Sequence, residues 1–240
     1  MSPSRLLWRK LLARRAGAFA LALLLLIVVA LFIGPWLSPH AVDAIDFDGE
    51  WATAPSTVNA HWFGTDSLGR DVFVRTLAGG RISLLVAFAA TLVSLLIGVS
   101  YGAIAGYFGG ALDEWMMRAV DILYALPFLF LVILLMVLFG RNVVLVFVAI
   151  GAINWLDMAR VVRGQVLALK QREFVLAAHT HGMSNAAILV RHILPNLAGV
   201  VLVTVTLTIP QVILTESFLS FLGLGVQEPA TSWGTLINEG

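Results

Sequence analysis

The sequence contains few residues whose types and spacing could support catalysis. Its two lysines, Lys10 and Lys170, do not follow a glycine, so the G-x-x-x-x-G-K loop that cradles phosphates is absent. The chain has no cysteine, which excludes disulfides, thiolate metal sites and cysteine nucleophiles. His179 and His181 are two residues apart and would point to different faces of a helix, which disfavours a shared metal ion. The sequence therefore predicts no catalytic residue, no metal ligand and no nucleotide site of its own.

Polar side chains gather instead in the last long apolar block. Buried polar groups are costly in lipid and tend to face a bundle interior or a water-filled path. Threonine hydroxyls can bond back to their own helix, which leaves Gln211 and Glu216 as the stronger candidates. We therefore expect Gln211 and Glu216 to line a translocation path, with Pro210 loosening the backbone beside them.

Four glycines recur every four residues and would form one nearly straight ridge on a helix. They are Gly98, Gly102, Gly106 and Gly110. Small residues let another backbone approach closely, so the ridge predicts a helix-packing surface within this chain rather than a substrate site.

The composition indicates that these residues lie in a membrane. Hydrophobic residues make up 60% of the chain and charged residues 12%, whereas a soluble domain has about 25% charged residues. A helix that crosses about 30 Å of hydrocarbon needs about 20 apolar residues. Four blocks have about that length: residues 16–37, 82–108, 122–140 and 197–215. A fifth block, 143–156, is shorter, but it is counted as a span because Arg141 and the basic segment after Asp157 would otherwise lie on the same side of the membrane. The expected fold is an all-α integral membrane protein with about five spans.

The distribution of Lys and Arg predicts the orientation, because these residues are retained on the cytoplasmic side. With five spans and the N-terminus inside, the inner segments hold eleven of the fifteen basic residues. This predicts a cytoplasmic N-terminus and first anchor at 1–37, and a solvated extracytoplasmic loop with little packed core at 38–80. The membrane core follows at 81–240, and it includes a cytoplasmic segment at 157–196.

The segment 157–196 is too polar for the bilayer and too regular for a linker. Residues 163–181 contain helix formers and no proline, Gly182 can take the positive φ that ends a helix, and Ser184 or Asn185 can cap the next helix. The segment is therefore expected to form a helix, a turn and a second helix that pack on a partner protein. An amphipathic helix resting on anionic lipid is the alternative.

These residues resemble the EAA loop of binding-protein-dependent ABC import permeases. The resemblance rests on Glu173-Phe-Val-Leu-Ala177-Ala178-His-Thr-His-Gly182 followed by Arg191-His192-Ile-Leu-Pro195-Asn196. Three further segments resemble the dipeptide, oligopeptide and nickel branch of that family: Gly64-Thr-Asp66-Ser-Leu-Gly69-Arg70-Asp71, Gly109-Gly110-x-x-Asp113, and Glu216-Ser-x-Leu-Ser-Phe-Leu-Gly-Leu-Gly225.

The resemblance implies a type I ABC importer transmembrane domain, with 81–240 as the permease core. Leu176 stands where the loop usually has a glutamate, so we expect shape and apolar contact to contribute more to the partner interface than charge. The family continues beyond the position of Gly240, which implies that a final span is missing. The residues that the resemblance assigns to ATPase coupling are Glu173, Ala177, Ala178, Gly182, His192, Pro195 and Asn196.

The function implied is that of a permease subunit that moves di- or oligopeptides across the bacterial cytoplasmic (inner) membrane. Its partners would be a second homologous permease, two ABC ATPases that bind ATP and Mg²⁺, an extracytoplasmic solute-binding protein and membrane lipid. The chain itself would bind no cofactor, and its net charge of +1 gives no basic field for nucleic acid.

The sequence also allows other substrates and other classes of function. Nickel complexes and glutathione remain alternative substrates. A secondary transporter driven by an ion gradient should show carboxylates in mid-span, which the apolar blocks lack. A membrane scaffold without transport would not need Gln211, Pro210 and Glu216 in one helix.

Overall fold

The computed structural model describes residues 13–45, 51–140, 143–226 and 230–239, and all the regular elements in these ranges are helices. The chain divides into two compact units, one formed by Met1–Ile82 with Pro229–Gly240 and the other by Ser83–Glu228. The all-helical membrane fold expected from the sequence is confirmed. The basic residues Arg5, Arg9 and Lys10, which supported a cytoplasmic N-terminus, lie outside the described residues.

Within the described ranges, three helical stretches are long and apolar enough to cross a membrane. They are α2 (Arg15–Leu37), α3 (Val72–Phe108) and the continuous stretch Asn185–Phe221. The helix α2 matches the expected anchor. The helix α3 begins ten residues before the apolar block at 82, because Asp71 accepts a hydrogen bond from the Val74 N–H at 2.8 Å and so caps its first turn.

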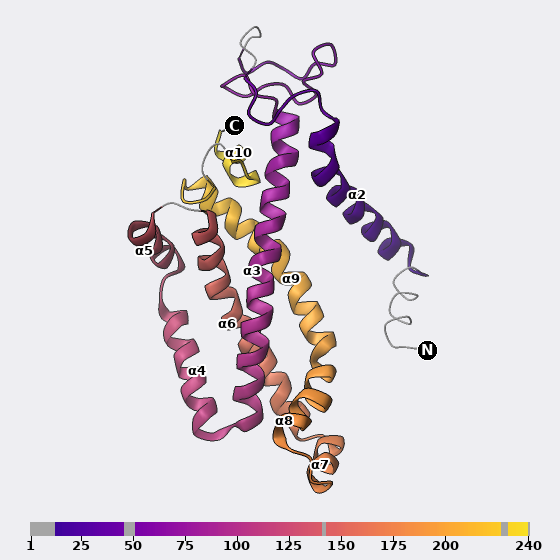
Figure 1. Ribbon diagram of the computed structural model, residues 1–240, viewed down its shortest axis with the longest axis vertical. Helices are drawn as coiled ribbons and strands as arrows, with labels where there is room; N and C mark the ends of the chain where they lie inside the picture. Colours follow the sequence, from indigo (N-terminus) through magenta and orange to yellow (C-terminus); the bar gives the residue numbers. More distant parts are fainter. Residues whose placement is uncertain (1–12, 46–50, 141–142, 227–229, 240) are drawn as a thin grey trace. The chain divides into compact units, whose positions relative to one another are not determined.

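The third apolar block is not the continuous helix that the sequence analysis expected. The chain forms α4 (Gly110–Ala125) and α5 (Phe128–Phe139), which meet at an angle of 81° (Figure 1). The cause is Pro127, which has no N–H to donate and forces the preceding Leu126 into an extended conformation with ψ 127°. The bent pair counts as a fourth candidate span, and the expectation of about five spans is not contradicted.

The helix α6 (Val143–Lys170) is much longer than the apolar block at 143–156. The single helix expected over 163–181 is interrupted at Gln171 and Arg172, and a separate helix, α7 (Glu173–Thr180), follows. Asp157, expected at the start of the cytoplasmic segment, lies in the middle of α6.

The turn after α7 has the conformation that the sequence predicted. Gly182 has φ +73°, its N–H donates to the His179 carbonyl, and the Met183 N–H donates to the Ala178 carbonyl. This pattern is a Schellman motif, which needs a left-handed residue and therefore favours glycine. Ser184 then caps α8 (Asn185–Ile188) through the Ala187 N–H.

A π-helical turn, η1 (Leu189–Ile193), joins α8 to α9 (Leu194–Phe221). Pro195 lies in the first turn of α9 and has no N–H to pair with the carbonyl of Arg191. The wider turn therefore occurs where an α-helical hydrogen bond could not form.

One buried apolar cluster fixes α7, α8 and η1 to the long helices of the second unit. The cluster consists of Ala103, Tyr107, Met158, Val162, Val166, Val175, Ala178, Ile188, Ile193 and Leu197. Its members come from α3, α6, α7, α8, η1 and α9. Figure 1 shows α7 and α8 at the end of this unit where α3 turns into α4. A displacement of α7 or α8 would therefore be passed on to three long helices.

Candidate functional site

The two alanines assigned to ATPase coupling lie in different environments. Ala178 is buried against the apolar cluster, whereas Ala177 is exposed. Two large apolar side chains are exposed on the same helix, Phe174 at 40% and Leu176 at 54%. Glu173 is exposed in the first turn of α7, where its negative charge interacts favourably with the positive end of the helix dipole. The helix α7 thus has one face packed on the cluster, and on its exposed side Phe174, Leu176 and Ala177 lie among the polar Glu173, His179 and Thr180.

Tyr107, in the last turn of α3, holds this segment in place. Its hydroxyl lies 3.3 Å from His179 Nε2 and donates to Asn185 Oδ1 at 3.1 Å, while its backbone carbonyl accepts from Lys170 Nζ. One side chain therefore contacts both α7 and α8. Tyr107 was not among the residues predicted from the sequence, because nothing in the local sequence distinguishes it from other tyrosines of a membrane protein.

The remaining coupling residues lie around the start of α9. Asn196 Nδ2 donates to the His192 carbonyl at 2.6 Å, and His192 is partly buried. Pro195 and Asn196 are exposed. These residues shape the connection between η1 and α9 and are separate from the exposed face of α7.

Three of the four ridge glycines face α6. A Cβ atom at Gly98 would lie 2.6 Å from Met158 Cβ, and one at Gly106 would lie 2.9 Å from the Arg163 carbonyl oxygen. A Cβ at Gly102 would overlap the backbone of Ala159. Gly110 is not part of the ridge, because it begins α4 with φ +58° and has no neighbour within 4 Å of a Cβ position.

Polar pairs join α4 to α6 along their length. Arg163 binds Asp113 through two hydrogen bonds of 2.5 and 2.6 Å, and Arg160 Nη2 donates to Asp121 at 2.6 Å. Further along, the Tyr124 hydroxyl donates to Asp157 Oδ1 at 2.5 Å, and the Arg160 guanidinium lies 4.2 Å from the centre of the Tyr124 ring. These pairs could not be predicted from the sequence, because the partners are between 33 and 50 residues apart.

The two residues expected along a translocation path do not share a site. Glu216 is fully buried and accepts hydrogen bonds from Ser83 at 2.9 Å and from Ser220 at 2.7 Å. Gln211 is exposed and lines a recess of about 220 Å³ between α4, α5, α6 and α9, with Tyr124, Asn154 and Asp157. Glu216 thus links α3 to α9, whereas Gln211 faces open space.

A network of opposite charges, largely buried, joins the segment before α3 to the first turn of α3 and to α10 (Trp233–Glu239). Asp66 Oδ2 accepts from Arg70 Nε at 2.7 Å and lies 3.4 Å from Arg75 Nε, and Arg75 Nη2 donates to Glu239 at 2.7 Å. Arg75 is 2% exposed. These ion pairs connect side chains in a segment whose composition supplies little apolar core, and the solvated extracytoplasmic loop expected at 38–80 stays a prediction.

The charges around Asp66 set its protonation. Burial raises the pKa of Asp66, but hydrogen bonds from the backbone and side chain of Arg70 and from the Leu68 N–H outweigh this effect and hold the pKa below its usual value. Asp66 therefore stays ionised in the folded protein at pH values where a free aspartate begins to protonate.

One cluster in the described ranges has the composition of a metal site, although the sequence predicted none. Ligand atoms of His40, His61 and Asp71 lie within 4.8 Å of one another. However, Asp71 already caps α3 and accepts from His61 Nδ1 at 2.8 Å, and the two imidazole rings are stacked. Hydrogen bonding between the loop and the helix accounts for this geometry.

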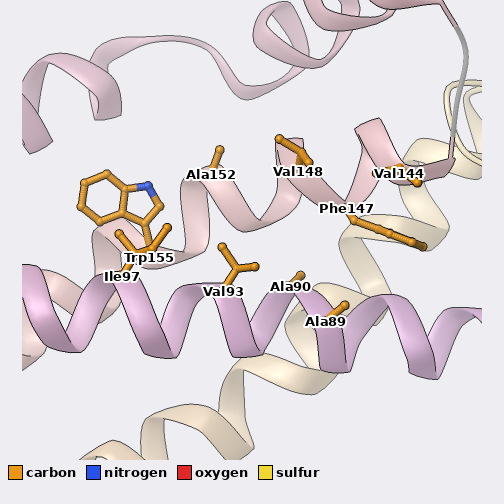
Figure 2. A pocket seen from close by; sticks show the side chains of 9 residues that line it. All are labelled: Ala89, Ala90, Val93, Ile97, Val144, Phe147, Val148, Ala152 and Trp155. Carbon is orange, nitrogen blue, oxygen red and sulfur yellow. The ribbon is translucent and has the colours of Figure 1, made fainter.

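An apolar groove runs between α3 and α6 (Figure 2). It has a volume of about 260 Å³ and is lined by Ala89, Ala90, Val93, Ile97, Val144, Phe147, Val148, Ala152 and Trp155. Figure 2 shows aliphatic and aromatic side chains along both helices. Such a lining suits hydrocarbon and offers little to a polar solute.

Comparisons with known proteins support a common family. The model of the family described as "Binding-protein-dependent transport system inner membrane component" matches residues 98–240, and that of the "N-terminal TM domain of oligopeptide transport permease C" matches residues 2–55. The oligopeptide transport system permease protein OppC of Haemophilus influenzae is 48% identical over 98% of this chain and 77% of its own length. The dipeptide transport system permease protein DppC of Bacillus subtilis is 49% identical over 97% of this chain and 72% of its own length. The glutathione transport system permease protein GsiD of Pectobacterium atrosepticum is 38% identical over 99% of this chain and 78% of its own length.

Proposed function

The chain belongs to the family of inner-membrane components of binding-protein-dependent transport systems, and on that premise we propose how its parts act in ATP-driven peptide import. It is the permease subunit of an ABC importer that carries oligopeptides or dipeptides across the membrane. It works with a second permease, two ATPase subunits that bind ATP and Mg²⁺, and an extracytoplasmic binding protein. The family membership supports this function and not the ion-gradient alternative.

The surface that receives the ATPase is the exposed face of α7. The observation that carries this assignment is that α7 buries Val175 and Ala178 in the apolar cluster while it exposes Phe174, Leu176 and Ala177. Exposed apolar side chains beside small ones favour a protein groove as their partner. A helix lying on anionic lipid would use basic residues on its outer face, whereas the exposed side chains of α7 include no lysine or arginine; they are Glu173, Phe174, Leu176, Ala177, His179 and Thr180.

The apolar cluster explains how a push on α7 would reach the membrane. Close-packed cores transmit displacement because they do not deform continuously. Val175 and Ala178 contact the same cluster as Met158 of α6 and Leu197 of α9. Closure of the ATPases would therefore tilt α6 and α9 together with α7.

The same assignment determines the orientation. The N-terminus and the α7–α8 segment face the cytoplasm, and the charged segment before α3 faces the binding protein. Retention of Lys and Arg on the cytoplasmic side supports this orientation. The outer segment is held by four interacting charges, Asp66, Arg70, Arg75 and Glu239, which suits a surface that must keep its shape when a binding protein docks.

A substitution on the exposed face of α7 tests the coupling assignment. We expect Ala177→Trp to lower both co-purification of the ATPase and peptide-stimulated ATP hydrolysis, because the indole would fill the space that the partner needs. The control is Ala111→Trp, at an exposed position in the first turn of α4. Membrane insertion and yield should be the same for both variants. Full ATPase binding and transport by Ala177→Trp would show that α7 does not receive the ATPase.

A further inference from the structure

The recess that contains Gln211 combines polar groups that are unusual within a membrane. It is lined by Tyr124 and Phe128 beside the bend between α4 and α5, by Ile150, Ile153, Asn154 and Asp157 of α6, and by Gln211 and Thr215 of α9. Its volume of about 220 Å³ is room for about seven waters, so it accepts the end of a solute rather than a whole peptide.

Asp157 gives the recess its charge. It lies 14 residues after Val143, the first residue of α6, and so roughly 20 Å along the helix. An ionisable side chain that lines a recess of a membrane protein is a candidate functional site. Asp157 is exposed to the recess rather than hidden between helices.

The hydrogen bonds around Asp157 leave capacity for a donor. Its Oδ1 accepts from the Tyr124 hydroxyl, while its Oδ2 accepts no hydrogen bond from the described residues. Arg160, three residues further along α6, binds Asp121 and lies over the Tyr124 ring. The α4 helix ends at Ala125, so the negative end of its dipole lies beside Tyr124. The recess therefore favours a cation that can donate hydrogen bonds.

Two side-chain amides, those of Gln211 and Asn154, line the recess together with Asp157. The side-chain amide of Gln211 has no hydrogen-bond partner among the described residues and is exposed. Asn154 Nδ2 donates to the Ile150 carbonyl of its own helix, which leaves its Oδ1 available as an acceptor. A carboxylate beside the Gln211 amide and the Asn154 Oδ1 acceptor matches an ammonium group followed by a peptide bond.

We propose that this recess is a transient binding site for the N-terminal ammonium and first peptide bond of the transported peptide. Asp157 and Tyr124 bind the ammonium, and Gln211 and Asn154 bind the peptide group. The bend at Pro127 supports this role, because interrupted helices line solute sites in other transporters. The inference rests on the proposed function, since it assumes that peptides pass this chain.

The test uses the whole importer in proteoliposomes with its ATPases and binding protein. The chain has no cysteine, so Thr215→Cys creates a single thiol on it at the recess. The probe is the peptide Ala-Cys-Ala, activated as a disulfide with thiopyridine, and labelling of this chain is measured by mass spectrometry during ATP turnover. The control is Leu207→Cys, which is 68% exposed on the same helix and does not line the recess.

We expect ATP-dependent labelling of Thr215→Cys and little labelling of Leu207→Cys. Adding Asp157→Asn should lower the labelling about tenfold, because a hydrogen bond to a charged group is worth at least that factor. N-acetylation of the probe should have a similar effect. Equal labelling at the two positions, or labelling unaffected by N-acetylation, would overturn the proposal while peptide uptake continued. Absence of ATP-dependent peptide uptake by the unmodified importer would overturn the proposed function, and the recess with it.

Discussion

Asp66 shows how single residues stabilise the segment before α3. It accepts hydrogen bonds from the N–H groups of Leu68 and Arg70 and from the Arg70 guanidinium, and its side chain is 11% exposed. A carboxylate held in this way must be ionised to satisfy its neighbours. Charge at this position is therefore structural and does not depend on any ligand.

The lowered pKa of Asp66 predicts a pH dependence. A group whose pKa is lower in the folded state contributes stability above its unfolded pKa of about 3.9 and loses that contribution as pH falls through the folded value. We expect Asp66→Asn to melt at a lower temperature than the parent protein at pH 7, because hydrogen bonds to a charged acceptor are worth about 1.5–3 kcal/mol.

Thermal melts in detergent would measure this difference. The gap between the parent and Asp66→Asn should narrow as the pH falls below about 4, because Asp66 then binds a proton in the unfolded chain while it is still ionised in the folded one, and the gap should close as the pH passes below the lowered folded pKa. Asp43→Asn is the control, because Asp43 is exposed. A gap of the same size at pH 7 and pH 3 would contradict the role of the ionised carboxylate.

At the scale of elements, the packing of α3 on α6 depends on glycine. Gly102 lies directly against the backbone of Ala159, and Gly98 lies against Met158. The four-residue period of these glycines predicted a ridge, but it could not predict which helix would cover it. Gly110 follows the same four-residue spacing but does not pack on α6, because the chain turns at Gly109 and α3 has already ended.

We predict that Gly102→Leu disturbs assembly before it changes substrate choice. The added side chain would force α3 and α6 apart, and overpacking of this kind costs about 1–3 kcal/mol or more. Ser100→Leu is the control, because Ser100 is exposed on the same helix. Yield and melting temperature in detergent would report the effect. Normal assembly of Gly102→Leu with an altered range of imported solutes would mean that the ridge lines the path.

Prediction from the sequence succeeded where the signal was local. The long apolar block at 16–37 gave α2, and the spacing from the alanine pair to Gly182 gave the turn with positive φ. The prediction of one continuous span over 122–140 was wrong at Pro127, because it rested on the apolar composition of the block and not on the backbone chemistry of proline. The pairing of Glu216 with Ser83 could not be predicted, since 133 residues separate them and no periodicity links them.

At the scale of the whole molecule, the division of the chain across the membrane remains a prediction. It depends on where Lys and Arg fall, and part of that evidence comes from the N-terminal residues outside the described ranges. Exposed positions within the described ranges offer a direct check, because the chain has no cysteine to confuse labelling.

Single cysteines at Thr57 and Arg172 should be labelled from opposite sides of the membrane. Both positions are exposed, one in the segment before α3 and one between α6 and α7. In intact cells, a membrane-impermeant maleimide should label Thr57→Cys, and it should label Arg172→Cys only after the cells are opened. Labelling of both from outside would require a different topology.

The π-helical turn η1 has a consequence for insertions and deletions. A turn of this type holds one residue more than α-helical pairing would, within a helix that otherwise runs from Asn185 to Phe221. Deleting one residue from 189–193 would let ordinary pairing continue and would rotate the preceding segment by about 100° relative to α9. The exposed face of α7 would then point elsewhere with every contact residue retained. Natural variants of this permease should therefore differ in the amino-acid identities at 189–193 but keep the number of residues in this stretch.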